Sequence, residues 1–296
     1  MATEYQLFPG CLMTNRLPFL EASAKVVLDE LGVLYSSTEF ACCPNPVGLK
    51  FVDNKTWCAL AARNLAVSEK EGKNILSLCN GCAQSLLIAA HEMKHDPNLK
   101  KEVNGILSKV GKEYKGTTDV VHFVKLLYEE VGVERIKASV KHPLTGLRVA
   151  LHPGCHYARP SHILKIEEDV MNLQYLRKLV EATGATAVVY DQENLCCGNV
   201  VRNTDPYTAN TMLKSKIDSA KRAGADCLVA NCPSCFQQLD TEQAKVKSIA
   251  EEGEEYKLPV FYITELIGLA MGKDPAILGL KFHRNKGKEA LAKVNL

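Results

Sequence analysis

Ten of the twelve cysteines form two copies of one five-cysteine pattern, which is typical of metal ligation in a reducing compartment. Each copy has a single cysteine, an adjacent pair after 30 or 40 intervening residues, and a C-x2-C motif after another 35 or 34. The first copy consists of Cys11, Cys42, Cys43, Cys79 and Cys82, and the second of Cys155, Cys196, Cys197, Cys232 and Cys235. A structural zinc ion takes four ligands. Five thiols gathered twice therefore indicate two sites for a cofactor that contains several metals.

The two halves also match outside the cysteines, which indicates a duplicated unit. Pro9-Gly10 precedes the first cysteine of one copy, and Pro153-Gly154 precedes that of the other. The matching segments, first half and then second half, are 5–11 and 149–155, 75–79 and 227–232, and 120–123 and 260–262. From this alignment we expect a first repeat domain over 1–143 and a second over 144–296, the latter with a basic C-terminal tail.

Each half has short apolar runs that alternate with amphipathic segments, a pattern typical of α/β proteins. Apolar residues recur at helical spacing from Leu17 to Leu31, and Gly32 supplies a stop signal. Asp53 is a candidate N-cap for a helix that would bury Trp57. We therefore expect two tandem domains, each a small parallel sheet flanked by helices. Because ligands bind beyond the carboxyl ends of parallel strands, the cysteine loops should converge there.

The composition excludes several other classes of function. Lys plus Arg is 36 and Asp plus Glu is 34, so no charge excess indicates a nucleic-acid partner. The chain has no run of about 18 apolar residues that would span a membrane and no basic-then-apolar leader, so we expect a cytoplasmic protein. It has no G-x-G-x-x-G, P-loop or ferredoxin-type cysteine run. Electrons for redox chemistry would therefore come from another protein.

With its doubled signature, the chain resembles the cysteine-rich CCG domain family over nearly its whole length. The second copy contains the literal motif Cys196-Cys197-Gly198, whereas the first reads Cys42-Cys43-Pro44 and keeps both candidate ligands. Within that family the chain is most similar to the B subunits of CoB–CoM heterodisulfide reductases. Relatives in hydroxy-acid oxidation and thiol-driven fumarate reduction often carry a fused ferredoxin-like segment, which is missing from this sequence.

The resemblance implies an oxidoreductase with two noncubane [4Fe-4S] clusters. Carried over by position, the ligands of the first are Cys11, Cys42, Cys43, Cys79 and Cys82, and those of the second are Cys155, Cys196, Cys197, Cys232 and Cys235. The implied reaction, part of methanogenesis, is reduction of CoM-S-S-CoB to CoM-SH and CoB-SH, with the disulfide cleaved between the clusters. The implied partners are a ferredoxin-like iron–sulfur protein and a flavin-containing protein of the same reductase, with a hydrogenase or formate dehydrogenase as an optional upstream source of electrons.

Residues near the cysteines are candidates for other roles. His152 and His156 flank Cys155 and could donate protons to a product thiolate or hydrogen-bond a cluster sulfur. Four cations that follow cluster cysteines are candidate anchors for a polyanionic substrate: Arg16, Lys50, Arg159 and Arg202. The two cysteines outside the pattern, Cys58 and Cys227, are expected to be small core residues.

Two other functions are compatible with the same cysteines. The chain could be an iron–sulfur electron-transfer subunit of a glycolate- or lactate-type hydroxy-acid dehydrogenase, in which the clusters relay electrons and cleave nothing. Zinc bound by four of each five thiols would instead make it a structural or interaction module. Iron content and visible colour distinguish zinc from iron–sulfur clusters.

Overall fold

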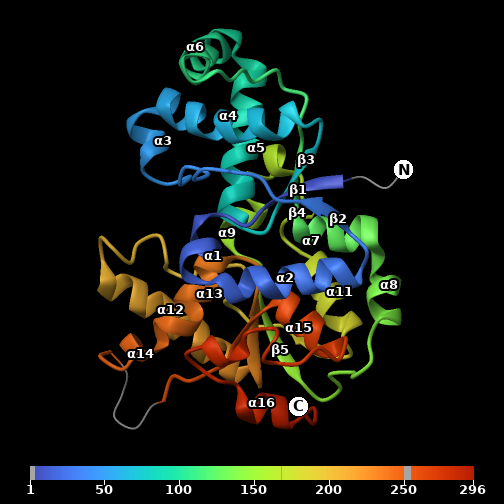
Figure 1. The fold of residues 1–296 in the computed structure, drawn as a ribbon. Helices are drawn as coiled ribbons and strands as arrows, with labels where there is room; N and C mark the ends of the chain where they lie inside the picture. The colour runs from blue at the N-terminus through green and yellow to red at the C-terminus, as the bar shows by residue number, and fades with distance from the viewer. Residues whose placement is uncertain (1–3, 168, 250–254) are drawn as a thin grey trace.

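Two four-stranded parallel sheets form the centres of the two halves of the chain (Figure 1). The computed structural model describes residues 4–167, 169–249 and 255–296. The first sheet has the strand order β2-β1-β3-β4 and the second the matching order β6-β5-β7-β8. The strands are β1 (Glu4–Phe8), β2 (Leu34–Ser36), β3 (Asn74–Ser77), β4 (Val120–His122), β5 (Arg148–His152), β6 (Thr186–Val188), β7 (Cys227–Ala230) and β8 (Val260–Tyr262). The predicted fold class is confirmed.

Helices flank both sheets. In the first half they are α1 (Cys11–Arg16), α2 (Pro18–Glu30), α3 (Leu49–Val52), α4 (Asn54–Lys70), α5 (Asn80–His95), α6 (Pro97–Leu107), α7 (Phe123–Lys125) and α8 (Val133–Ala138), with the 3-10 turn η1 (Ser108–Val110) and the π-helical segment η2 (Leu126–Gly132). In the second half they are α9 (Cys155–Ala158), α10 (Ser161–Leu164), α11 (Tyr175–Ala182), α12 (Pro206–Arg222), α13 (Pro233–Thr241), α14 (Gln243–Val246), α15 (Ile263–Ala270) and α16 (Lys288–Ala292), with the 3-10 turn η3 (Leu280–Phe282).

The same local device starts the long helix of each repeat. The Asp53 side chain accepts a hydrogen bond from the Thr56 backbone N–H at 3.0 Å, which caps α4 as the sequence predicts. Asp205 caps α12 in the same way through Thr208, also at 3.0 Å. The two capping residues therefore set a common register for comparing α4 with α12.

The strand order places the cysteine loops at equivalent edges. From β1 the chain passes to β2 on one side and then returns to β3 on the other, so β1 and β3 form a topological switch point. Phe8 at the end of β1 pairs with Ser77 at the end of β3, and Cys11 and Cys79 follow within three residues. In the second sheet β5 and β7 have the same relation, with His152 paired to Ala230.

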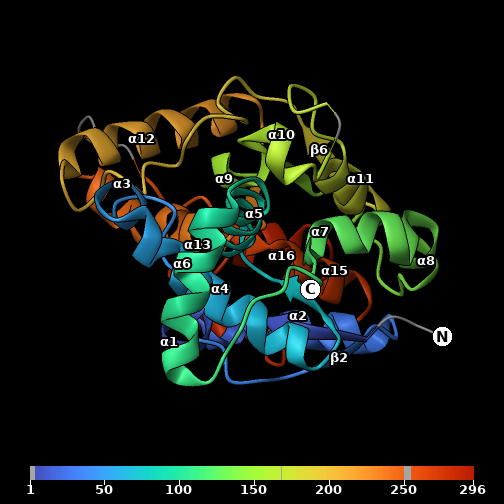
Figure 2. The same ribbon diagram turned by 90° about the horizontal axis from the view of Figure 1, so that it is seen from above.

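Each half extends a helical arm onto the other half. After Cys11, α1 and α2 leave their own sheet, and α2 lies beside α15 of the second half (Figure 1). Ser23 and Thr264 join these two helices through a hydroxyl–hydroxyl hydrogen bond of 2.7 Å. After Cys155, α9 and α10 pack against α5 of the first half (Figure 2), where Gln84 donates to the Arg159 carbonyl at 2.6 Å. The halves are thus joined by reciprocal arms.

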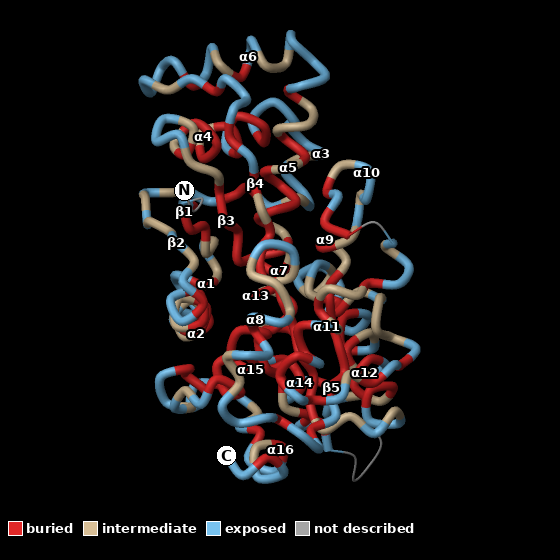
Figure 3. Tube along the Cα trace, turned by 90° about the vertical axis from the view of Figure 1, so that its right-hand side faces the viewer, coloured by how far each residue is buried: buried red, intermediate tan, exposed pale blue. Residues whose placement is uncertain are grey.

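The core follows the strands, and the C-terminal tail packs onto it. Buried residues lie along the interior around both sheets, while the outer turns of α6 are exposed (Figure 3). The tail is fixed by the buried pair His283–Glu265, 2.8 Å apart, and by the Arg284 backbone N–H, which donates to Asp240 at 2.7 Å. Within the described ranges, no helix has the length and apolar character needed to cross a membrane.

Candidate metal centre

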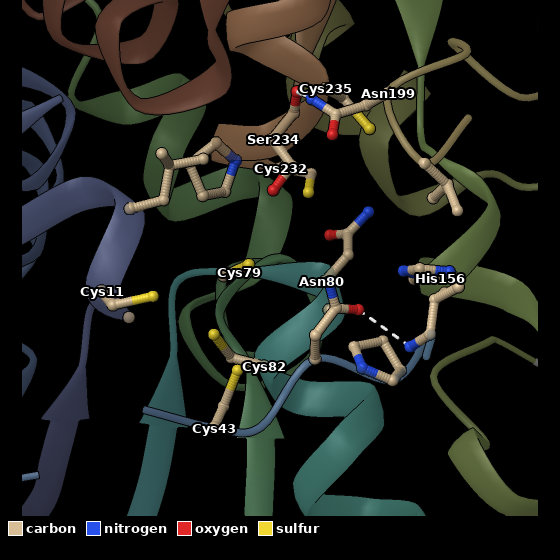
Figure 4. Close-up of a pocket in the computed structure, with 18 of the residues that line it drawn as sticks. Cys11, Cys43, Cys79, Asn80, Cys82, His156, Asn199, Cys232, Ser234 and Cys235 are labelled. Carbon is tan, nitrogen blue, oxygen red and sulfur yellow. Dashed lines mark hydrogen bonds between the residues drawn. The ribbon is translucent and has the colours of Figure 1, made fainter. Parts of the chain in front are cut away.

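All ten patterned cysteines line one cavity of about 300 Å³ between the two halves (Figure 4). Asn80 and His156 also line it, as do Asn199 and Ser234. In the close-up, Cys43 and Cys82 lie on one side of Asn80, and Cys232 and Cys235 lie on the other. The convergence that the strand pattern predicts is therefore present, and the two groups share one space.

Helix beginnings position most of the thiols. Cys11 and Cys155 are the first residues of α1 and α9. Cys79 and Cys232 are the N-cap residues of α5 and α13, and the second cysteine of each C-x2-C motif is the third residue of that helix. Because the N-terminal end of a helix carries partial positive charge, this placement stabilises thiolates over thiols.

A glycine before the first cysteine of each copy allows two cysteine loops to approach closely. Gly10 has φ +80°, and a Cβ on it would lie 2.7 Å from the Cys82 sulfur. Gly154 has φ +83°, and a Cβ there would lie 2.8 Å from the Asn80 amide nitrogen and 3.4 Å from the Cys235 sulfur. A side chain at either position would fill the space beside the C-x2-C thiols, so both positions require glycine.

Within each group the thiols interact in succession, and the two groups meet in the middle. The Cys197 and Cys235 sulfurs are 3.6 Å apart. The order of neighbours is Cys11, Cys42, Cys43, Cys82 and Cys79 in the first group and Cys155, Cys196, Cys197, Cys235 and Cys232 in the second. Across the two repeats, Cys79 and Cys232 are neighbours, and each is among the main influences on the pKa of the other. The ten thiols thus form a continuous array with an approximate two-fold centre between these two residues.

The array cannot ionise fully without added positive charge. Hydrogen bonds from Cys235 and Cys79 lower the pKa of Cys232. The pKa of Cys79 is raised first by its contact with Cys232, and that of Cys235 is raised first by Cys197. Metal ions bind thiolates and supply the compensating charge, so the donor set fits polynuclear metal centres.

His152 supplies a further observation that fits such a centre. The side chain is fully buried, and neither ring nitrogen has a hydrogen-bond partner among the described residues. One ring nitrogen and the sulfurs of Cys197 and Cys235 all lie within 4.8 Å of one another. Burial lowers the pKa of His152 to about 3, so the ring is neutral at neutral pH and can donate one N–H. A sulfur-rich centre would provide the missing acceptor.

Two residues at the ends of the fourth strands, His122 and Tyr262, stabilise the seam, which is the region where the two cysteine groups meet at Cys79 and Cys232. The Tyr262 hydroxyl donates to the Leu78 carbonyl and also lies 3.2 Å from the Asn231 carbonyl, the residues directly before Cys79 and Cys232. The Nε2 of His122 lies 2.8 Å from the side-chain amide oxygen (Oδ1) of Asn80. Asn80 in turn donates to the Pro153 carbonyl at 2.7 Å. These bonds fix the central cysteines relative to each other.

The sequence analysis missed Asn80 and Tyr262 as seam residues. Asn80 lies inside the first C-x2-C motif, but its counterpart in the second motif is Pro233, so the comparison of repeats does not single it out. Tyr262 lies at the end of an apolar strand, which by itself indicates only a core residue. One feature of the sequence could have indicated both residues. Each has a polar side-chain atom close to the end of a strand and beside a cysteine loop.

The other candidate residues have different surroundings. His156 lines the cavity and is half-buried, whereas His152 lies behind the Cys197–Cys235 pair. None of the four predicted anchoring cations, all of them in the described ranges, lines the cavity: Arg16, Lys50, Arg159 and Arg202. Lys50 instead binds Glu92 at 2.6 Å, and Arg202 binds Glu242 at 3.2 Å. A role for any of the four in substrate binding stays a prediction. Cys58 and Cys227 are fully buried outside the cavity lining, as expected.

The fold and the site define a tandem α/β protein with two cysteine-rich repeats facing one cavity. The chain belongs to the CCG cysteine-rich domain family, whose profile matches residues 5–86 and 149–240. The family resemblance expected from the sequence is therefore confirmed.

Several relatives are similar over almost their full lengths. The chain is 40% identical to the B subunit of the ferredoxin/F420H2-dependent CoB–CoM heterodisulfide reductase of Methanosarcina acetivorans, covering 97% of this chain and 96% of the relative. It is 38% identical, with the same coverage, to the B subunit of the ferredoxin:CoB–CoM heterodisulfide reductase of Methanosarcina mazei. It is also 31% identical to the membrane anchor subunit of 8-methylmenaquinol:fumarate reductase from Wolinella succinogenes, covering 95% and 96%.

A solved structure has the same fold. A Helicobacter pylori protein described as hypothetical superimposes with a TM-score of 0.75 at 17% identity. The match covers 96% of this chain and 52% of that one, so the present chain spans about half the length of that protein.

Proposed function

We propose that the chain is the catalytic iron–sulfur subunit of a reductase that splits the CoM-S-S-CoB heterodisulfide into CoM-SH and CoB-SH. The observation that carries this proposal is the single cavity lined by both five-cysteine groups. The relatives named as B subunits of heterodisulfide reductases support the substrate and the oxidoreductase class. In this proposal 1–143 and 144–296 are the two repeat domains, and each five-cysteine group holds one noncubane [4Fe-4S] cluster.

The reaction consumes two electrons and two protons for each disulfide, and the products are two thiols. When bound, the clusters supply the electrons and Lewis-acidic iron next to the cleaved bond. The chain positions the substrate between the two groups, where Cys79 and Cys232 meet. His156, half-buried in the cavity lining, is placed to hydrogen-bond a product thiolate and deliver one proton.

The electrons come from other proteins of the same reductase in this proposal. The sequence has no G-x-G-x-x-G or P-loop motif with which the chain could bind a nucleotide donor of its own. The relatives are named as B subunits, which supports an assembly of several different chains. A ferredoxin-like iron–sulfur protein that is reduced by a flavin-containing protein is the proposed source.

One observation favours a second function. The relative from Wolinella succinogenes is named for a fumarate reductase that uses 8-methylmenaquinol, and that name contains no disulfide. A chain with this pattern could therefore serve as an electron-transfer subunit that cleaves nothing. The hydroxy-acid dehydrogenase alternative belongs to the same class of electron-transfer proteins.

The test is chemical analysis of anaerobically purified chain, followed by turnover. We expect about eight iron and about eight acid-labile sulfide per chain, as two four-iron clusters require, and little zinc. Addition of CoM-S-S-CoB to the reduced protein should then yield two thiols. Zinc without sulfide would remove the redox function altogether. Full iron and sulfide without thiol release would instead favour the electron-transfer function.

A further inference from the structure

A buried lysine lies behind the second five-cysteine group without a carboxylate partner. Lys216 on α12 is fully buried. Its ammonium donates to the Gln192 carbonyl and lies 5.5 Å from the centroid of the Tyr190 ring. Within the described residues it forms no salt bridge, and the nearby Glu193 carboxylate is held by Arg177 at 2.9 Å. A charge removed from water requires a compensating charge, so Lys216 needs another anion.

The second five-cysteine group is the candidate for that anion, because thiolates that hold metal ions carry negative charge. Burial lowers the pKa of Lys216 to about 8, and Cys197, Cys235 and Cys196 act against this shift by favouring the ammonium. All three are proposed ligands of one centre. The side chain is therefore placed as the counter-ion of the second five-cysteine group.

The equivalent position in the first repeat is neutral. Lys216 follows the N-cap Asp205 by eleven residues, and Asn64 follows the N-cap Asp53 by the same eleven. Asn64 donates to the Cys42 carbonyl at 3.0 Å and accepts from the Ala41 N–H at 2.8 Å. It positions the backbone of its cysteine pair but carries no charge.

A second pair of equivalent residues differs in the same direction. His152 lies three residues before Cys155, and Phe8 lies three residues before Cys11. One buried ring nitrogen of His152 lies within 4.8 Å of the sulfurs of Cys197 and Cys235, whereas the Phe8 ring packs on Phe40 at 4.7 Å between centroids. One group thus has a buried cation and an N–H donor behind it, and the other has an amide and a hydrocarbon ring.

We propose that Lys216 and His152 are positioning residues that give the centre on the second repeat a higher reduction potential than the centre on the first. The proposal rests on the proposed function, because it requires a redox-active centre in each group. Reduction adds negative charge, which a nearby ammonium and an N–H donor to sulfur stabilise. Cys11 and Cys42 of the first group are exposed to water. Water also stabilises added negative charge, so this exposure raises the potential of the first centre and reduces the expected difference. A full charge in the protein interior is screened much less than one in water, so the effect of Lys216 dominates.

The experiment is a potentiometric titration of the full anaerobically purified chain, followed by electron paramagnetic resonance and absorbance. We expect two separate midpoint potentials in the wild type. K216M should lower the higher midpoint and leave the lower one in place, and K216R should restore it. F8H, the matched change in the first repeat, should raise the lower midpoint towards the higher one.

Two controls separate the possible failures. Iron and sulfide are measured on every variant, because their absence in the wild type would overturn the proposed function and not only this inference. If K216M loses iron, H152F replaces it as the test of the same centre. If K216M or H152F retains iron and sulfide, unchanged midpoints or a shift confined to the lower midpoint would overturn the assignment of the higher potential to the second repeat.

Discussion

Behind the cysteine pair of the first repeat lies the neutral amide of Asn64, and behind that of the second lies the buried ammonium of Lys216. The candidate ligands, the Pro-Gly turns and the capped helices are the same in both repeats. The residues at equivalent positions of α4 and α12, Asn64 and Lys216, are not. The duplicated fold thus keeps the ten cysteines and varies the residues around them, which would give two chemically similar centres different properties.

The two groups also differ in their access to water. Cys11 and Cys42 are exposed and line a second cavity of about 610 Å³ with Glu39 and Arg63. The equivalent Cys155 and Cys196 are half-buried. The first group is therefore open on two sides, one facing the shared cavity and one facing solvent.

The largest expected effect comes from removing either group. The double variants C79S/C82S and C232S/C235S should each lose about half of the iron, because three remaining thiols do not satisfy a four-iron centre. Turnover of the disulfide should fall to background in both, since the substrate needs both sides of the cavity. Iron analysis and thiol release measure the two effects. C58A, a buried cysteine outside the cavity lining, should retain all of the iron.

Half of the wild-type activity in either double variant would contradict a substrate site shared by the two groups. It would indicate that the two centres work independently and that the proximity of Cys79 and Cys232 has no role in turnover.

A smaller effect is expected where the repeats differ in the cysteine-pair loop. Gly198 has φ +90°, and a Cβ there would lie 2.8 Å from the Ala209 carbonyl oxygen. G198A should lower the free energy of unfolding by about 3 kcal/mol, from the strained backbone and the clash together. Urea denaturation of the anaerobic protein measures the change. G48A is the matched control, because Gly48 has φ +96° but no atom within 4 Å of an added Cβ, and it should cost about 1 kcal/mol.

The seam should respond to loss of the Asn80 amide. N80A leaves the Pro153 carbonyl and His122 Nε2 without partners in the interior, which costs about 2 kcal/mol. The midpoint of urea denaturation measures the loss. An unchanged midpoint would mean that the two bonds contribute nothing to joining the halves.

The smallest expected effect is that of the Tyr262 hydroxyl. Y262F keeps the ring, which stacks on Phe123 at 5.6 Å, and removes the hydrogen bonds to the two carbonyls before Cys79 and Cys232. We expect a loss of about 1 kcal/mol in the free energy of unfolding. Y207F, on an exposed ring, should change the same measurement by less than about 0.5 kcal/mol.

The fold and the convergence of the ten cysteines could be predicted because they depend on local spacing. Pro-Gly after an apolar run places Cys11 and Cys155 at strand ends, and Asp53 fixes a helix start through its own side chain. Such features require only neighbours in the sequence. The class of fold then brings the loops together without further information.

Residues whose roles depend on distant partners could not be found in this way. Lys216 lies between the buried Leu213 and Ile217, and a lone lysine at helical spacing indicates a helix surface in most sequences. Closeness in sequence to a cysteine did not bring Lys50 or Arg202 into the cavity lining, because Glu92 and Glu242 bind them elsewhere. Only the packed structure supplies those partners.

The reciprocal arms have a consequence for the origin of the protein. The segment after Cys11 packs on the second half, and the segment after Cys155 packs on the first. A single repeat would therefore leave its arm and one wall of its thiol pocket without a partner. It would recover both only as a symmetric homodimer, with the two-fold axis between two copies of one central cysteine. Fusion of such a dimer into one chain frees the two halves to diverge, which no homodimer can do.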